Sequence, residues 1–301
     1  MNQHVRSAYP AWRALLGAGL AGLFAASGCA PGARAAEVRN VSERVFPLDP
    51  GGQVVVKSQN GRIVVEAWDR PDVRVQITRV IRADDEKRAA ELMRGLMVDV
   101  DTSPASIRLT SRYPKRHEEI GIWAILVHKV EALNVHYYLQ VPKQSSLNLR
   151  TSNGEIRIRG ALGTVNALTV NGDVELTGAA GPADVRTTNG EVRLTGISGS
   201  AIARTTNGGV TADVASLPKG GVVNLQTTNG DVDVRLPKDV AATVEATTTN
   251  GKVNLDFPVV SQGRLTTKSI RGTIGGGGAR VSLQTTNGNV DLSPAPPARA
   301  R

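Results

Sequence analysis

The sequence is poor in aromatic residues and has almost no cysteine. Phenylalanine, tryptophan and tyrosine make up 3% of the 301 residues, and there is one cysteine. A ligand pocket lined by aromatic rings, or the aromatic platforms of nucleic-acid modules, are therefore not expected. No pair of cysteines exists to form a disulfide within the chain. The core has to be built from valine, leucine, isoleucine and alanine, which suits thin stacked strands.

The motifs of common catalytic sites are also missing. The chain contains no G-x-S-x-G, H-E-x-x-H or G-x-x-x-x-G-K-[ST] pattern, and the spacing of its histidines supports no metal site. We therefore expect no catalytic residue, no cofactor and no bound metal. The formal net charge is +9, with the basic residues spread along the chain. Such a surface favours an anionic envelope glycan or lipid headgroups, or another envelope protein, over nucleic acid as the partner.

What the chain does contain is a repeat built on the dipeptide Asn-Gly. The repeated asparagines are Asn153, Asn171, Asn189, Asn207, Asn229, Asn250 and Asn287. Threonine stands two residues before each of them, and valine or isoleucine stands three residues after each. The first three steps are 18 residues long. A fixed period predicts stacked repeats, with the asparagines forming a ladder along the turns.

The alternating apolar residues on both sides of each turn fit two architectures. Asn-Gly is the strongest short hairpin signal, so an antiparallel meander is one of them. It would oppose Arg157 to Arg150, and like charges directly opposite each other destabilise a sheet. Stacking each copy on the next instead gives Arg157, Glu175 and Arg193 in one column, which is attractive. The charge pattern therefore favours a parallel β-solenoid with right-handed coils.

The predicted organisation is all-β with a short helix-containing part at the beginning. Residues 37–146 form an N-terminal β-rich part, in which Asp84 opens a helix over 84–97 that packs through Leu92, Met93, Leu96 and Met97. Residues 147–292 form the solenoid, with a degenerate copy expected at Arg271-Gly272. An early copy of the repeat occurs at Asn60-Gly61. The proline-rich segment 293–301 is expected to be a disordered tail.

The first 28 residues have the pattern of an export signal. A basic start without acids leads into a short apolar run over residues 14–26. The single cysteine follows in Ala26-Ser27-Gly28-Cys29, which resembles a bacterial lipobox and predicts lipidation of Cys29. The alternative is ordinary cleavage after Ala35, which would discard this cysteine. Both alternatives predict an exported protein of the periplasm or outer membrane. If Cys29 is lipidated, the lipid also anchors the protein to the membrane.

The stretch Asn60-Gly61-Arg62-Ile63-Val64-Val65-Glu66-Ala67-Trp68-Asp69-Arg70-Pro71 is similar to the opening of the bacterial DUF4097 "putative adhesin" family. The helix, the Val141-Pro142-Lys143 strand end and the serial T-x-N-G copies follow in the family's order. The resemblance covers residues 38–292. It implies a β-helix-like, pectate-lyase-like fold and an envelope location, and it transfers no catalytic residue.

Two columns of charged residues could carry a function. Glu155, Asp173 and Glu191 stand two residues after successive asparagines, where stacked carboxylates beside Arg157 and Arg193 could serve a uronate-directed lyase. Salt bridges and solvent explain the same residues without chemistry. Arg150, Arg186 and Arg204 stand three residues before the asparagines, with no acid in the column, and are candidates for an anionic partner. We expect a non-catalytic, adhesin-like or structural binding module, with the carbohydrate-active enzyme as the alternative.

Overall fold

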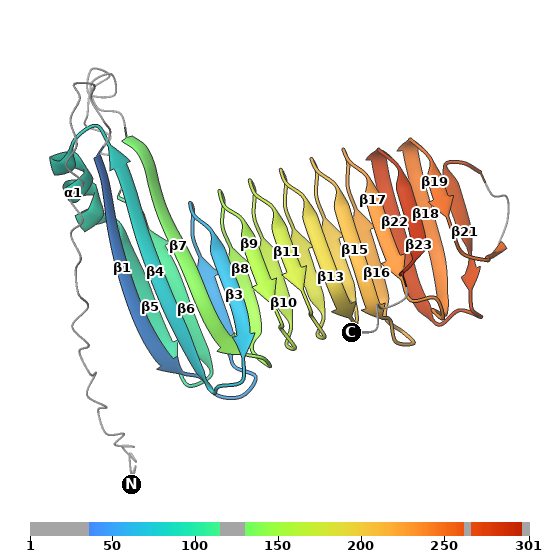
Figure 1. The fold of residues 1–301 in the computed structure, drawn as a ribbon, viewed down its shortest axis with the longest axis horizontal. Coiled ribbons are helices and arrows are strands. Elements are labelled where there is room, and N and C mark those ends of the chain that lie inside the picture. Colours follow the sequence, from blue (N-terminus) through green and yellow to red (C-terminus); the bar gives the residue numbers. More distant parts are fainter. Residues whose placement is uncertain (1–35, 115–129, 262–265, 297–301) are drawn as a thin grey trace, which may run out of the picture.

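The computed structural model describes residues 36–114, 130–261 and 266–296, which form two facing β-sheets (Figure 1). Sheet A contains, in spatial order, β1 (Ala36–Pro47), β4 (Asp72–Ala83), β7 (Val130–Pro142), β3 (Ile63–Trp68), β9 (Ile156–Arg159), β11 (Val174–Thr177), β13 (Val192–Ser198), β15 (Val210–Ser216), β17 (Val232–Leu236), β23 (Val290–Pro294) and β19 (Val253–Leu255). Sheet B contains β20 (Val260–Ser261), β21 (Ser269–Ile274), β18 (Ala242–Asn250), β22 (Ala279–Asn287), β16 (Val222–Gln226), β14 (Ala201–Arg204), β12 (Ala183–Arg186), β10 (Val165–Leu168), β8 (Ser146–Arg150), β2 (Gln53–Lys57), β6 (Ser106–Arg112) and β5 (Met97–Ser103).

Each Asn-Gly turn joins a strand of sheet B to a strand of sheet A, and successive units stack in parallel. Glu175 on β11 lies in register with Arg157 on one side and Arg193 on the other. The parallel solenoid that the charge pattern predicted is therefore confirmed, and the antiparallel meander is wrong. We call each strand–turn–strand unit a coil and name it by its asparagine.

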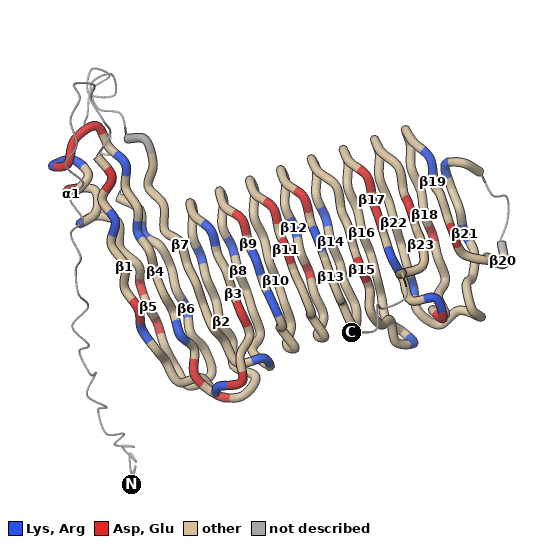
Figure 2. Tube along the Cα trace, in the orientation of Figure 1, with Lys and Arg blue, Asp and Glu red and all other residues tan. Residues whose placement is uncertain are grey.

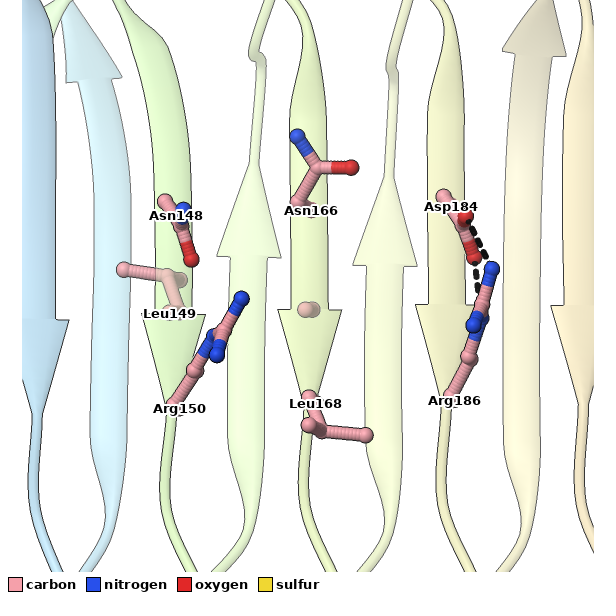
Figure 3. Close-up of a pocket in the computed structure, with 8 residues that line it drawn as sticks. Asn148, Leu149, Arg150, Asn166, Leu168, Asp184 and Arg186 are labelled. Carbon is pink, nitrogen blue, oxygen red and sulfur yellow. Dashed lines mark hydrogen bonds and ion pairs between the residues drawn. The ribbon is translucent and has the colours of Figure 1, made fainter.

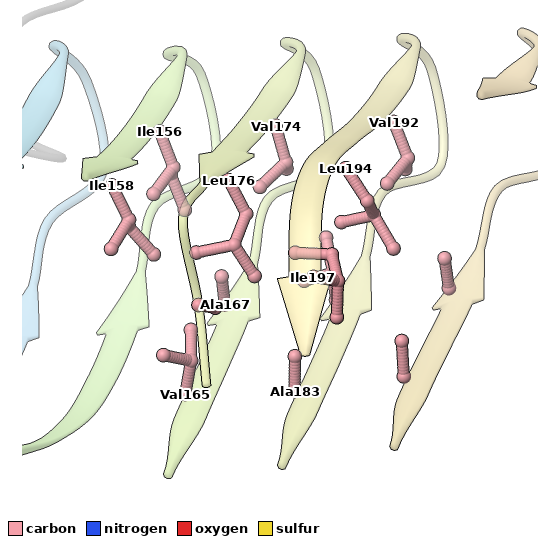
Figure 4. Close-up of a cluster of buried hydrophobic side chains, with 14 of the residues drawn as sticks. Ile156, Ile158, Val165, Ala167, Val174, Leu176, Ala183, Val192, Leu194 and Ile197 are labelled. Carbon is pink, nitrogen blue, oxygen red and sulfur yellow. The ribbon is translucent and has the colours of Figure 1, made fainter. Parts of the chain in front are cut away.

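The core between the sheets combines large side chains with small ones. In the first regular coils, sheet A contributes Ile156, Leu176 and Leu194, all fully buried. Sheet B faces them with smaller residues such as Ala167 and Ala183, as Figure 4 shows. Pairing large with small residues lets sheets built from four-residue strands pack closely without aromatic rings. The space between the sheets is therefore narrow enough to be filled without aromatic side chains.

The coils are not stacked in the order in which they occur in the chain. The Asn60 coil lies directly against the Asn153 coil, although 93 residues separate the two asparagines. The Asn287 coil lies between the Asn229 and Asn250 coils. Both apparent parts share one hydrophobic core, so the expected boundary at residue 146 does not separate two packing units.

The described residues at the two ends depart from the repeat. At the N-terminal end β1, β4 and β7 pair antiparallel, and α1 (Glu86–Gly95) packs against β1 and β4. The carboxylate of Asp85 caps the helix by accepting a hydrogen bond from the backbone of Arg88. The helix is shorter than predicted because Leu96 is extended, and Met97 is exposed on β5 instead of packing on a helix face.

At the other end, β21 pairs antiparallel with β18 and covers it. Arg271 and Gly272 belong to β21, so the degenerate copy expected there is wrong. Ser293 and Pro294, assigned to the tail, are part of β23, which pairs with β17. The predicted export signal, Cys29 and residues 297–301 lie outside the described residues. No helix among the described residues is long and apolar enough to cross a membrane.

Candidate functional site: the outer face of sheet B

The turn asparagines form the ladder that the repeat predicted. Each side-chain amide donates to the side-chain oxygen of the asparagine in the adjacent coil, over distances of 2.7 to 2.8 Å. The donors run in order from Asn250 through Asn287, Asn229, Asn207, Asn189, Asn171 and Asn153 to Asn60, which accepts. Beneath them, buried threonine hydroxyls donate to glycine carbonyls of the adjacent coil, as from Thr187 to Gly172 at 2.9 Å. These polar groups hold the turns together, and their bonding capacity is largely used within the chain.

The charged column of sheet A is neutralised within the chain. Glu155 contacts both Arg62, at 3.1 Å, and Arg157, which also reaches Glu175. Arg193 pairs with Glu191. One carboxylate oxygen of Asp173 accepts from the backbone of the next coil at 2.8 Å. The described residues contain no group of histidine, cysteine and carboxylate side chains arranged to hold a metal ion. This column therefore behaves as a salt-bridge ladder.

The outer face of sheet B carries a row of basic residues in register across its strands. From the N-terminal end, the row consists of Lys57, Arg150, Arg186 and Arg204, with Leu168 interrupting it between Arg150 and Arg186. Figure 2 shows how basic and acidic residues are distributed along the array. Arg186 and Arg204 are direct neighbours, as the sequence predicted, and Arg150 lies two strands from Arg186, across Leu168. We call these five residues the sheet B row.

Two of the three predicted arginines already have polar partners. Arg186 makes two hydrogen bonds to the carboxylate of Asp184, at 2.9 and 2.7 Å, and this pairing raises the pKa of its guanidinium. The column itself contains no acid, but Asp184, two positions earlier on the same strand, reaches Arg186 from outside the column. Arg204 donates to the side-chain oxygen of Gln226 at 3.1 Å. Neither arginine is fully available to an outside anion.

The unbalanced charge lies instead at Lys57 and Arg150. These two residues are opposite each other on β2 and β8, both are exposed, and neither side chain forms a hydrogen bond or ion pair within the described residues. Neighbouring strands are about 4.8 Å apart, so the two cations repel each other wherever solvent does not screen them. A single anion placed between them would relieve that repulsion.

A shallow depression of about 380 Å³ lies beside Arg150. It is lined by Asn148, Leu149, Arg150, Asn166, Ala167, Leu168, Asp184 and Arg186. Figure 3 shows Arg150 extending from β8 beside the amide groups of β8 and β10, with Leu168 below and the Asp184–Arg186 pair on the next strand. Next to an unpaired cation the surface therefore offers amides and an exposed leucine.

Lys57 was not among the residues predicted for this face. The signal that finds it is its position three residues before Asn60, the same offset that selects Arg150 from Asn153. It could be recognised only by knowing that the early Asn60 coil stacks directly on the Asn153 coil. The sequence interval between the two coils hides that contact.

The repeated strand–turn–strand units stack so that their strands pair in parallel within two facing sheets. This arrangement defines a β-solenoid built from very short coils. The model of the Toastrack DUF4097 family matches residues 53–293, and the chain belongs to this family. No curated protein matches the chain significantly.

Solved structures with similarity to the chain come from several bacteria. A "putative cell adhesion protein" from Clostridium sporogenes shares 12% identity, over 85% of this chain and 100% of that one, with a TM-score of 0.35. A "putative adhesin" from Bacteroides fragilis shares 10%, over 85% and 97%, with a TM-score of 0.39. A "putative lipid binding protein" from Parabacteroides distasonis shares 8%, over 85% and 97%, with a TM-score of 0.27.

Proposed function

We propose that the protein is an exported, non-catalytic, adhesin-like module that docks on anionic groups of the bacterial envelope through the outer face of sheet B. The observation that carries this proposal is the pair Lys57 and Arg150, two adjacent exposed cations without a counter-ion among the described residues. Cys29 would be lipidated and would tether the module. Six residues lie between it and the start of β1, so the tether of seven residue steps spans at most about 25 Å.

Phosphate and carboxylate groups fit this face chemically. A guanidinium binds either group through two parallel hydrogen bonds, and a neighbouring ammonium adds a second positive charge. The amides of Asn148 and Asn166 supply further hydrogen-bonding groups, and Leu168 supplies an apolar contact. The ligand class is thus the negatively charged group of an envelope glycan or of a lipid headgroup, which both sources present.

The outer face of sheet A provides the contrast. Two arginines of its charged column, Arg157 and Arg193, are engaged by glutamates of the same or the adjacent coil. An incoming anion would first have to displace those carboxylates, which leaves little net attraction. Those pairs also engage the carboxylates that a uronate-directed lyase would need free, and no contact among the described residues favours that alternative.

The proposal is tested by removing the two unpaired charges. In a chain carrying Cys29→Ser, which removes any acyl chain, the double variant Lys57→Ser with Arg150→Ser should bind vesicles of anionic phospholipid about 30-fold more weakly. The factor of about 30 follows from a binding free energy of about 1 kcal/mol for each basic residue near an anionic surface. Binding to neutral phosphatidylcholine vesicles should not change, and the difference between wild type and variant should shrink with added salt.

A matched control removes the same number of charges from sheet A. Arg157→Ser with Arg193→Ser should leave binding to anionic vesicles within about twofold, because those arginines are already neutralised. Immobilised lipopolysaccharide, assayed in parallel, separates a glycan source of the anion from a phospholipid source. Equal losses in the two double variants would show that net charge alone drives binding, and would overturn the assignment to sheet B.

A further inference from the structure

The outermost strand of sheet A, β1, has one side without a partner strand among the described residues. It is 12 residues long and pairs antiparallel with β4 along its whole length. The other outer strands are shorter: β5 has seven residues, β19 three and β20 two. A long open edge presents a row of unpaired backbone groups to any strand that can align with it.

The corresponding edge of sheet B is protected by its charges. On β5, Asp101 is exposed, and Asp99, two residues before it, is partly exposed and pairs with Arg112 of the neighbouring strand. A second copy of β5 aligned antiparallel would bring these aspartates against each other, and like charges directly opposite destabilise a sheet. Repulsion between acids therefore disfavours pairing of two copies along this edge.

The charges of β1 have the opposite arrangement. Arg39, Val41 and Glu43 are exposed and share one face of the strand, and Ser42 and Arg44 on its other face are exposed as well. Arg39 forms no ion pair within the described residues, and Glu43 contacts Arg74 at 3.4 Å across the sheet. Val41 and Val45 are exposed by 48% and 52%, although both are β-branched apolar residues on a strand edge. The strand therefore displays apolar groups flanked by one basic and one acidic residue.

We propose that a second copy of this chain pairs with β1 in an antiparallel arrangement centred on Val41. In that register Arg39 of each copy faces Glu43 of the other, and the two valines at position 41 meet on the two-fold axis. Moving the centre to residue 40 would set Glu37 against Glu43, and moving it to residue 43 would set two glutamates against each other. Among these three registers, only the one centred on Val41 sets opposite charges against each other, and in it sheet A continues from one copy into the next.

Cysteine cross-linking tests the register directly. In a full chain carrying Cys29→Ser, Val41→Cys supplies the only thiol. Opposed residues of antiparallel strands have Cα atoms about 4.5 to 5.5 Å apart, which a disulfide can span. We expect this variant to form covalent dimers at least about tenfold faster than Val45→Cys. The two residues at position 45 would be roughly 27 Å apart, at about 3.4 Å per residue.

Charge reversal tests the same interface without a covalent bond. Arg39→Glu alone should weaken dimerisation, measured by sedimentation equilibrium, by about tenfold or more, because it replaces two attractive pairs by two repulsive ones. Combining Arg39→Glu with Glu43→Arg should restore it. An effect on the fold alone would not be reversed by the second substitution.

Three outcomes would overturn the proposal. The first is cross-linking that is equally fast at positions 41 and 45, and the second is a double reversal that dimerises no better than Arg39→Glu. The third is a chain that stays monomeric up to about 100 μM, which would leave the open edge to a strand of a different protein.

Discussion

The tightest constraint at the scale of single residues lies at the turn glycines. Gly190 has a φ of +155°, and a Cβ added there would lie 2.2 Å from the carbonyl oxygen of Gly172 in the adjacent coil. That carbonyl also accepts the hydrogen bond from the Thr187 hydroxyl. A methyl group would therefore separate two coils at the point where the buried threonine and the asparagine ladder hold them together.

Gly190→Ala should destabilise the protein by about 3 kcal/mol, through backbone strain and the clash with Gly172. Gly209→Ala is the matched control in the next coil, because its nearest neighbour would be 3.4 Å from the added Cβ. We expect the control to change stability by less than about 1 kcal/mol. Urea unfolding with an unchanged m-value measures both, and equal losses would contradict this account of the turn.

A second constraint at this scale concerns repulsion between stacked aspartates. Asp233 lies in register with Asp291, and partial burial together with the charges of Asp291 and Asp231 raises the pKa of its carboxyl. A folded-state pKa above the unfolded value means that the ionised group destabilises the fold at neutral pH, and that this penalty disappears as the pH falls through the folded pKa.

Asp233→Asn should consequently raise stability at pH 7, by about 0.5 kcal/mol because the site is largely exposed and screened. The gain should vanish at a pH below the ordinary aspartate value of about 3.9, where both proteins are uncharged at this position. Thermal unfolding at the two pH values measures this difference. A gain that stays the same at both pH values would show that charge repulsion is not its cause.

At the scale of elements, the coil is the unit that can be added or removed. Deleting residues 172–189 removes one 18-residue repeat, β11 and β12, and joins Asn171 to Gly190, so that β10 and β13 form a single coil. The inward columns still match, because Val174 and Val192 occupy the same position in their coils. The deletion brings Arg157 beside Arg193, a repulsion of about 0.5 kcal/mol at an exposed site.

The shortened protein should therefore fold cooperatively, with a lower melting temperature and an unchanged β-type circular dichroism spectrum. Deleting only residues 172–180 removes β11 but leaves β12, so the next strand would enter the wrong sheet. That variant should not fold. Cooperative melting of both deletions, or of neither, would contradict the coil as the unit of structure.

The same modularity explains which parts of the fold could be predicted from sequence. Strand direction followed from one charged column, since Arg157, Glu175 and Arg193 alternate in sign. The stacking order did not, because every coil presents the same asparagine, threonine and valine columns to its neighbours. The residue pattern of the Asn287 coil is the same as that of the Asn250 coil. The spacing of the asparagines along the sequence therefore could not predict that the Asn287 coil lies between the Asn229 and Asn250 coils. The position of Lys57 beside Arg150 was hidden for the same reason.

At the scale of the whole molecule, the two sheets differ in how their charges are balanced. Sheet A pairs Arg157 and Arg193 of its charged column with glutamates of the same or the adjacent coil. Sheet B leaves Lys57 and Arg150 unbalanced, in the coils that stack nearest the N-terminal end of the described residues. A module tethered through Cys29 would thus carry its free positive charge close to the membrane, and an open β1 edge would let two such modules lie side by side.

Chemical labelling of lysines tests the orientation on which this account depends. Lys57 and Lys252 are both exposed, but Lys252 precedes β19 at the far end of sheet A. Acylation of each lysine by an amine-reactive ester, followed by peptide mass spectrometry, can be compared with anionic and with neutral vesicles. We predict that anionic vesicles slow the labelling of Lys57 several-fold and leave Lys252 unchanged. Equal protection of both lysines, or protection of Lys252 alone, would contradict docking through sheet B.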